Sequence, residues 1–204
     1  MLLLAGLLVV VASAIALRLP RTHLFHGIPS TTTGGGEVVP EECVSPVEDA
    51  CTGAVDLGSG WRIPYYRNYP LAQNSAVTSA VIVVHGTGRN ARSYFAGMLA
   101  AAANAHVRDR TLVLVPDFQA TDDDPAEGTA RWESEGWKIG DPAVSPSGLS
   151  SFEVLDRILD RLANKGAFPN LVEITLVGHS AGGQFVQRYA AIGLEPSLIR
   201  APRI

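Results

Sequence analysis

The sequence predicts an α/β fold in which a mainly parallel sheet is flanked by helices. Residues 80–84 form a continuous apolar run, and residues 111–115 and 171–177 are two further, mainly apolar segments of strand length; all three have the composition of strands that are buried on both faces. A segment with helical periodicity follows each run, so strand and helix alternate along the chain. Parallel strands need such crossover helices, and this alternation therefore favours a parallel sheet.

The three expected helices cover residues 91–105, 151–162 and 181–192. The first is rich in alanine, and the third ends before a glycine. The second begins after a capping serine, Ser150 or Ser151, and has the clearest apolar face. That face is formed by Phe152, Leu155, Ile158, Leu159 and Leu162.

Two regions depart from this alternation. Residues 61–71 are aromatic and β-type, and they predict one or two early strands near an edge of the sheet. Residues 119–150 form an irregular insertion that is longer than most connections. We expect its acidic run, residues 122–124, to be a solvated turn. Trp132 and Trp137 are expected to line an apolar pocket or to pack in the core or at its rim.

Length and composition limit the classes of protein that the chain can belong to. Its 204 residues suit one domain, and 47% hydrophobic residues exclude disorder throughout. Lys and Arg number 16 against 20 Asp and Glu, so the surface is not basic and nucleic acid is not an expected partner. Two cysteines exclude a four-cysteine zinc site, and we expect neither a metal nor another cofactor.

The N-terminus has the composition of a secretory signal. Residues 2–17 carry no charged side chain, and Ala12, Ala14 and Ala16 offer small-residue cleavage sites, so we expect residues 1–17 to be a signal peptide. The apolar run is shorter than the roughly 20 residues of a membrane-spanning helix. A secreted protein is therefore expected, with an uncleaved membrane anchor as the alternative.

Residues 18–53 are rich in proline, glycine and threonine, and we expect a flexible tether between the signal and a domain at residues 54–204. The tether contains Cys43 and Cys51. In an oxidising compartment these two residues are candidates for a disulfide that closes a short loop, worth about 2–3 kcal/mol. The alternative is two unrelated thiols.

A nucleophile motif follows the third predicted strand. Residues 178–182 read G-H-S-A-G between a strand and a helix, the context in which Gly-x-Ser-x-Gly places a serine on a sharp turn. Ser180 is therefore the candidate nucleophile. The N–H of Ala181, at the start of the helix, is available to an oxyanion.

A second set of donors is expected after the first predicted strand, where residues 85–88 read H-G-T-G. The carboxyl ends of parallel strands meet at one edge of a sheet, so this loop should lie beside Ser180. The N–H of Thr87 is the first candidate for the other half of an oxyanion hole, and that of Gly88 is the second.

The segments "VIVVHGTG" and "LVGHSAGG", in this order, resemble the N-terminal part of the α/β-hydrolase superfamily of esterases, lipases and related enzymes, over residues 76–193. The resemblance implies a serine hydrolase that acts on small-molecule esters or related acyl compounds. The same fold also carries non-catalytic members. The alternative is therefore an exported or membrane-tethered binding protein on this scaffold.

The chain departs from that family in one respect. The family places an acid and then a histidine after the serine, whereas the 24 residues after Ser180 contain neither Asp nor His. We therefore expect an incomplete α/β-hydrolase fold without its C-terminal strands. One edge of the strand before Ser180 is then expected to lack a neighbour, and this chain is expected to show little or no activity. We expect His85 to shape its loop and His179 to pack or to line the pocket.

Overall fold

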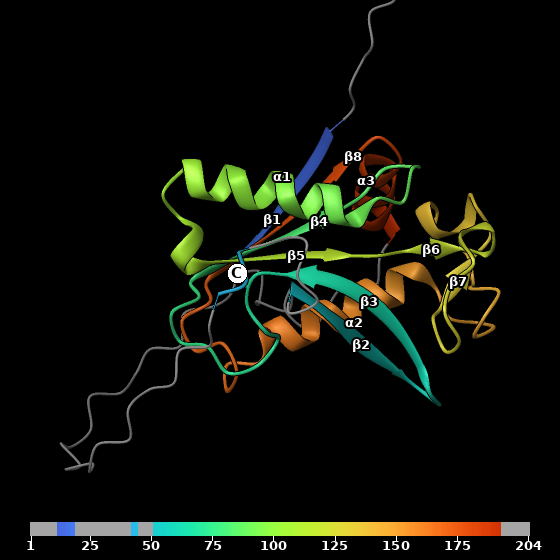
Figure 1. Ribbon diagram of the computed structural model, residues 1–204, viewed down its shortest axis with the longest axis horizontal. Coiled ribbons are helices and arrows are strands. Elements are labelled where there is room, and N and C mark those ends of the chain that lie inside the picture. The colour runs from blue at the N-terminus through green and yellow to red at the C-terminus, as the bar shows by residue number, and fades with distance from the viewer. Residues whose placement is uncertain (1–11, 19–41, 45–50, 193–204) are drawn as a thin grey trace, which may run out of the picture.

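The computed structural model describes residues 12–18, 42–44 and 51–192. The strands of its main sheet are β1 (Ala12–Arg18), β2 (Thr52–Gly58), β3 (Trp61–Arg67), β4 (Ser79–Val84), β5 (Thr111–Pro116) and β8 (Glu173–His179). Its α-helices are α1 (Ala91–Asn104), α2 (Ser151–Ala163) and α3 (Ala181–Ile192). The strands lie in the order β1-β8-β4-β5-β3-β2, with α1 on one side of the sheet and α2 on the other (Figure 1).

The fold class that the sequence predicts is confirmed, although the sheet is mixed. Its centre is parallel, because β4 pairs in parallel with both β5 and β8. The outer strands run antiparallel to their neighbours: β3 to β5, β2 to β3, and β1 to β8. Between β2 and β3 a tight turn leaves no room for a crossover helix, and this connection can only reverse the chain.

Alternating side chains of the central strands separate the core into two parts. Ile82 and Leu114 belong to the larger cluster, which includes the apolar faces of α2 and α3. Val83 and Val113 point to the opposite face and pack with α1. The sheet is thus buried on both faces, which explains the uninterrupted apolar runs of β4 and β5.

The apolar face predicted for α2 is buried as expected. Phe152, Leu155, Ile158, Leu159 and Leu162 are all buried. Ser150 is the N-cap residue, and its hydroxyl oxygen accepts a hydrogen bond from the Phe152 N–H at 3.1 Å. Residues 181–192, the third predicted helix, match the observed bounds of α3.

A strand from the N-terminal apolar segment lies at one edge of the sheet. β1 pairs along β8 from Ala12 opposite His179 to Arg18 opposite Glu173, and Ile15 packs against the larger core cluster. The expectation that this edge of β8 lacks a neighbour is therefore wrong. The backbone groups of β1 and of this edge of β8 are paired with each other, with Arg18 opposite Glu173 at one end. Residues 1–11 of the predicted signal lie outside the described part of the chain.

Part of the predicted tether is attached to the sheet. The Cys43 N–H donates to the Asn68 carbonyl at 2.7 Å, and Cys43 forms a disulfide with Cys51, with the two Cα atoms 5.3 Å apart. β2 starts at Thr52, two residues before the expected domain start. The remaining tether residues, 19–41 and 45–50, lie outside the described ranges.

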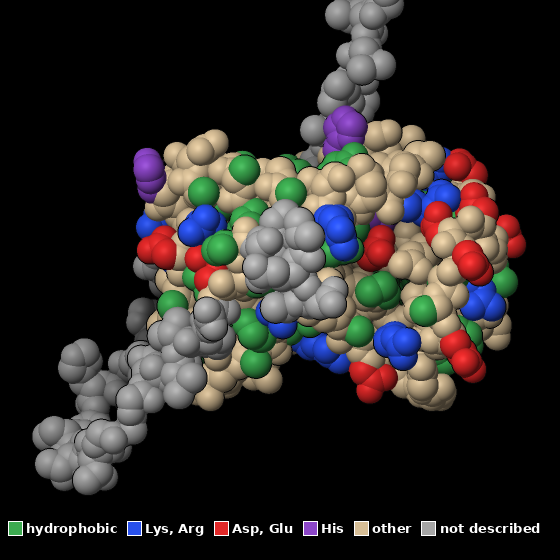
Figure 2. Space-filling view, viewed as in Figure 1, with side chains coloured by type: hydrophobic (Ala, Val, Ile, Leu, Met, Phe, Trp, Pro, Cys, Tyr) green, Lys and Arg blue, Asp and Glu red, His purple; other side chains and the backbone are tan. Residues whose placement is uncertain are grey.

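The segment between β5 and α2 contains a second small sheet, formed by β6 (Gln119–Ala120) and β7 (Arg131–Trp132). Trp132 and Trp137 have no exposed surface and belong to the core, so they do not line an open pocket. In Figure 1, β6 and β7 lie at the right-hand end of the molecule, and Figure 2 shows acidic side chains on the surface of that end. In the described ranges, no helix is long and apolar enough to cross a membrane.

Candidate active site

Ser180 occupies the turn between a strand and a helix. β8 ends at His179 and α3 begins at Ala181, which leaves Ser180 as the single residue between them. Its side chain is exposed, and its φ is +55°. This left-handed conformation costs a residue other than glycine about 1–2 kcal/mol. Packing around the turn therefore holds Ser180 in a conformation that its own sequence disfavours.

The two glycines of the motif explain how that conformation is held. A Cβ atom at Gly178 would overlap the backbone of Gly182. A Cβ atom at Gly182 would overlap the carbonyl oxygens of Val84 and His85. The end of β4, the end of β8 and the first turn of α3 thus approach each other at backbone contact distance, which no side chain permits.

The loop after β4 lies beside this turn, as the sequence predicts. A Cβ atom built on Gly86 would lie 3.5 Å from the Ser180 Cβ. Thr87 and Gly88 follow directly and are exposed, and their N–H groups make no hydrogen bond to any described residue. The N–H of Ala181 is at the first position of α3, where no acceptor exists within the helix. The structure therefore places unused backbone donors on two sides of Ser180.

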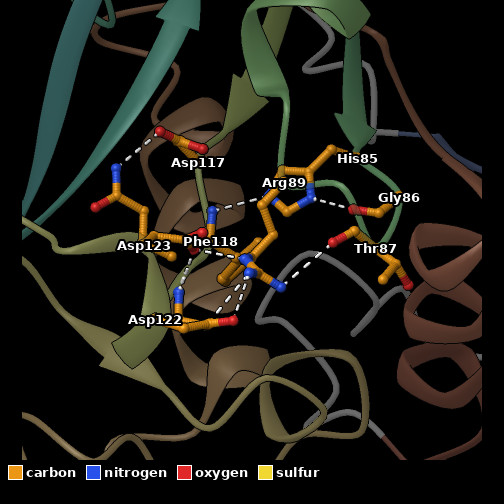
Figure 3. Close-up of polar contacts among 10 residues, drawn as sticks. His85, Gly86, Thr87, Arg89, Asp117, Phe118, Asp122 and Asp123 are labelled. Carbon is orange, nitrogen blue, oxygen red and sulfur yellow. Dashed lines mark hydrogen bonds and ion pairs between the residues drawn. The ribbon is translucent and has the colours of Figure 1, made fainter.

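His85 holds the loop from inside the protein. It has no exposed surface, and its Nε2 accepts a hydrogen bond from the Phe118 N–H at 3.0 Å (Figure 3). The ring proton therefore belongs on Nδ1, which lies 3.0 Å from the Gly86 carbonyl oxygen. Burial lowers the pKa of His85, so the ring is neutral. With both nitrogens engaged, His85 shapes the loop and has no lone pair free to act as a base.

His179 is engaged on the opposite side of the turn. Its Nδ1 lies 2.8 Å from the Tyr94 hydroxyl oxygen of α1. Both residues line a pocket of about 490 Å³ between α1 and the strands β4 and β8, whose apolar wall includes Val83, Met98 and Val177. Within the described ranges, the Ser180 hydroxyl makes no hydrogen bond, so neither histidine is in contact with it as a general base.

Arg89 is a part of the site that the sequence analysis missed. Its Nε donates to the Asp123 carboxylate at 2.5 Å, and an Nη lies 3.1 Å from the Asp122 carboxylate (Figure 3). The other Nη donates to the Thr87 carbonyl oxygen at 3.3 Å. Residues 122–124 are exposed, as expected of a solvated acidic turn, but Asp122 and Asp123 are also paired with an arginine of the neighbouring loop.

One signal in the sequence points to this contact. Arg89 comes directly after the H-G-T-G motif, and the acidic run follows the next strand of the parallel sheet. The carboxyl ends of adjacent parallel strands share an edge, so opposite charges that follow them are brought together.

Asp117 is a second acidic group near the loop. It follows β5, is half-buried, and accepts a hydrogen bond from the Gln119 side-chain amide at 2.9 Å. Burial raises the pKa of its carboxyl group. Among the described residues there is no group of three or more His, Cys, Asp or Glu side chains that could hold a metal ion.

Two comparisons with known proteins found a match to this chain. Residues 81–203, more than half of the chain, match the Alpha/beta hydrolase family. A solved structure of poly(aspartic acid) hydrolase-1 from Sphingomonas sp. KT-1 is 21% identical with a TM-score of 0.44; the match covers 74% of this chain and 51% of that one, about half its length. No curated protein matches the chain. The chain therefore belongs to the Alpha/beta hydrolase family.

Proposed function

We propose that this chain carries the nucleophile and the oxyanion donors of a secreted serine hydrolase that acts on small-molecule esters or related acyl compounds. The observation that supports this most strongly is the exposed Ser180 at φ +55°, held between glycines that admit no side chain. Backbone strain of this kind clusters at functional sites, and at Ser180 it holds an exposed hydroxyl between the end of β8 and the start of α3.

In the proposed reaction the Ser180 Oγ attacks the carbonyl carbon of the acyl substrate. The carbonyl oxygen becomes an oxyanion, which accepts hydrogen bonds from the N–H groups of Ala181 and Thr87, with Gly88 as the alternative second donor. The alcohol leaves, and water then releases the acyl group from Ser180. In the first step a general base takes the proton of the Ser180 hydroxyl and gives it to the leaving alcohol; in the second it takes a proton from water and returns it to the Ser180 oxygen. We propose that a histidine and an acid that are not among the described residues supply this base.

The proposed location of the protein is extracellular. The supporting observation is the charge-free segment at residues 2–17 with its small-residue cleavage sites. Of the seven residues of β1, cleavage after Ala14 would remove three from the edge of β8, and cleavage after Ala16 would remove five. Expression in a secreting host followed by N-terminal sequencing tests this: a mature terminus near residues 15–18 supports export, whereas an intact Met1 on cytosolic protein contradicts it. An intact Met1 in the membrane fraction identifies an uncleaved anchor.

Labelling with a fluorophosphonate tests the proposed nucleophile. The purified 204-residue chain and its Ser180→Ala variant are incubated with the probe, and the adduct is located by peptide mass spectrometry. We expect slow labelling on the peptide that contains Ser180 and none in the variant. Labelling elsewhere, or equal labelling of both proteins, contradicts the proposal. A folded chain that takes up no probe favours the non-catalytic binding protein on the same scaffold.

A further inference from the structure

The loop that carries the proposed oxyanion donors has few contacts of its own. Thr87 and Gly88 belong to no helix or strand, and both are exposed. Inside the protein the loop is held by His85, whose ring bonds to the Gly86 carbonyl oxygen and the Phe118 N–H. On the outside, the guanidinium of Arg89 donates a hydrogen bond to the Thr87 carbonyl oxygen.

Arg89 connects three parts of the site at once. Its backbone N–H donates to the Gly86 carbonyl at 3.0 Å, which closes the turn of the loop, and its φ is +48°. Its guanidinium bonds to the Thr87 carbonyl oxygen and to the carboxylates of Asp122 and Asp123 (Figure 3). One planar group therefore links the donor loop to the segment between β5 and α2. Arginine suits this position, because its fixed fork of donors serves several acceptors together.

The two carboxylates differ in how firmly they are held. The Asp123 side chain is 27% exposed, and its Oδ2 also accepts a hydrogen bond from the Ala120 N–H at 2.7 Å. Burial raises the pKa of Asp123, but the hydrogen bonds from Arg89 and Ala120 outweigh burial and hold the pKa below its usual value. The Asp122 side chain is 59% exposed. Asp123 is therefore the fixed anchor, and Asp122 is an outer, solvent-screened partner.

We propose that Arg89 is a positioning residue: through Asp123 it fixes the loop that carries Thr87 and Gly88, so that their N–H groups are in place when charge develops on the substrate oxygen. This inference rests on the proposed function of Ser180. It extends that function, because Asp123, in the segment between β5 and α2, would then influence how fast Ser180 reacts. A shift of about 1 Å in a positioned group reduces rates by up to about 100-fold.

The test measures fluorophosphonate labelling of Ser180 over a range of probe concentrations, which separates the half-saturating concentration from the maximum rate. Four variants are compared with the unmodified chain: Arg89→Gln, Arg89→Lys, Asp123→Asn and Asp122→Asn. We expect Arg89→Gln and Asp123→Asn to lower the maximum rate by about 10- to 100-fold with little change in half-saturation. Arg89→Lys, which keeps the charge, should recover part of the rate, and Asp122→Asn should lower it less than about 3-fold.

A double variant separates positioning from general loss of structure. If Arg89 acts through Asp123, Arg89→Gln combined with Asp123→Asn is no slower than either single variant. If Arg89 only stabilised the fold, its variants would show a lower thermal midpoint in proportion to their loss of labelling rate. The half-saturating probe concentration and the maximum rate would then both change. A normal maximum rate in Arg89→Gln, or multiplied losses in the double variant, overturns the inference.

The Ser180→Ala variant distinguishes failure of the proposed role of Arg89 from failure of the proposed function of Ser180. If Ser180→Ala still takes up the probe at the same rate, the proposed nucleophile is wrong. If Ser180→Ala abolishes labelling while Arg89→Gln labels normally, the nucleophile stands and only the role of Arg89 is rejected.

Discussion

The two halves of the candidate site are built in different ways. The turn that carries Ser180 is fixed by backbone packing, since Gly178 and Gly182 leave no room for a side chain. The loop that carries Thr87 is fixed by side chains, one buried histidine and one partly exposed arginine. The comparison teaches that backbone packing sets the position of the proposed nucleophile, whereas side chains, two of them far apart in the sequence, set the position of the proposed donors Thr87 and Gly88.

The largest expected effect comes from placing a side chain in the rigid half. Gly182→Ala forces a Cβ atom into the carbonyl oxygens of Val84 and His85. Overpacking of this kind destabilises proteins by about 1–3 kcal/mol and sometimes more. We expect such a loss in urea unfolding, together with loss of Ser180 labelling.

Gly97→Ala is the matched control for this variant. Gly97 is exposed in α1, and a Cβ atom built there meets nothing within 4 Å. Alanine at this helical position should stabilise the protein by about 0.5–1 kcal/mol. If Gly182→Ala behaves like Gly97→Ala, the close backbone approach at the turn does not exist.

The buried histidine of the donor loop predicts a dependence of stability on pH. The pKa of His85 lies below the ordinary value of 6.5 in the folded protein, so between these two values the unfolded chain binds more protons. Stability contributed by neutral His85 is therefore complete above about pH 6.5 and is lost as the pH falls, by at most about 1.4 kcal/mol per pH unit. Asp117, whose pKa is raised by burial, opposes this loss at lower pH.

Urea unfolding at several pH values between 8 and 5 measures this contribution. His85→Gln keeps a polar side chain but removes the titrating ring, so its unfolding free energy should change less steeply with pH below about 6.5 than that of the unmodified chain. Parallel pH profiles for the two proteins would show that His85 is not the buried neutral group described above.

A smaller effect is expected at Ser180 itself. Glycine adopts a positive φ without strain, so Ser180→Gly should be more stable than Ser180→Ala by about 1 kcal/mol, and neither variant should label. Thermal unfolding of the pair measures the difference. Equal midpoints would mean that the turn carries no strain.

The sequence predicts the rigid half of the site well, because short-range chemistry determines it. The glycines and Ser180 fall between a strand and a helix whose start at Ala181 follows from the motif. Prediction fails where distant residues decide the outcome. The ion pairs of Arg89 join residues more than 30 positions apart, and composition alone gives no reason to prefer them over solvation.

The N-terminal segment shows the same limit for the fold. Its apolar residues suit a signal peptide and an edge strand equally well, and only the presence of an apolar edge on β8 makes the strand possible. For Trp132 and Trp137 the sequence likewise leaves a pocket wall, the core and its rim as alternatives. In the structure they pack with Phe118, at ring distances of 5.5 Å and 6.0 Å.

The most direct test of the central claim, that Ser180 is a nucleophile served by backbone donors, is aryl-ester hydrolysis by the purified chain beside its Ser180→Ala variant. Oxyanion donors without a contacting base leave an acceleration of roughly 10³ to 10⁴ over water. The account predicts a rate of this order at most for the chain, and a lower rate for the variant. Equal rates in the two proteins would contradict the claim. An ordinary enzyme rate that is lost in the variant would show that a general base within the chain serves Ser180, and it would contradict the low rate predicted here.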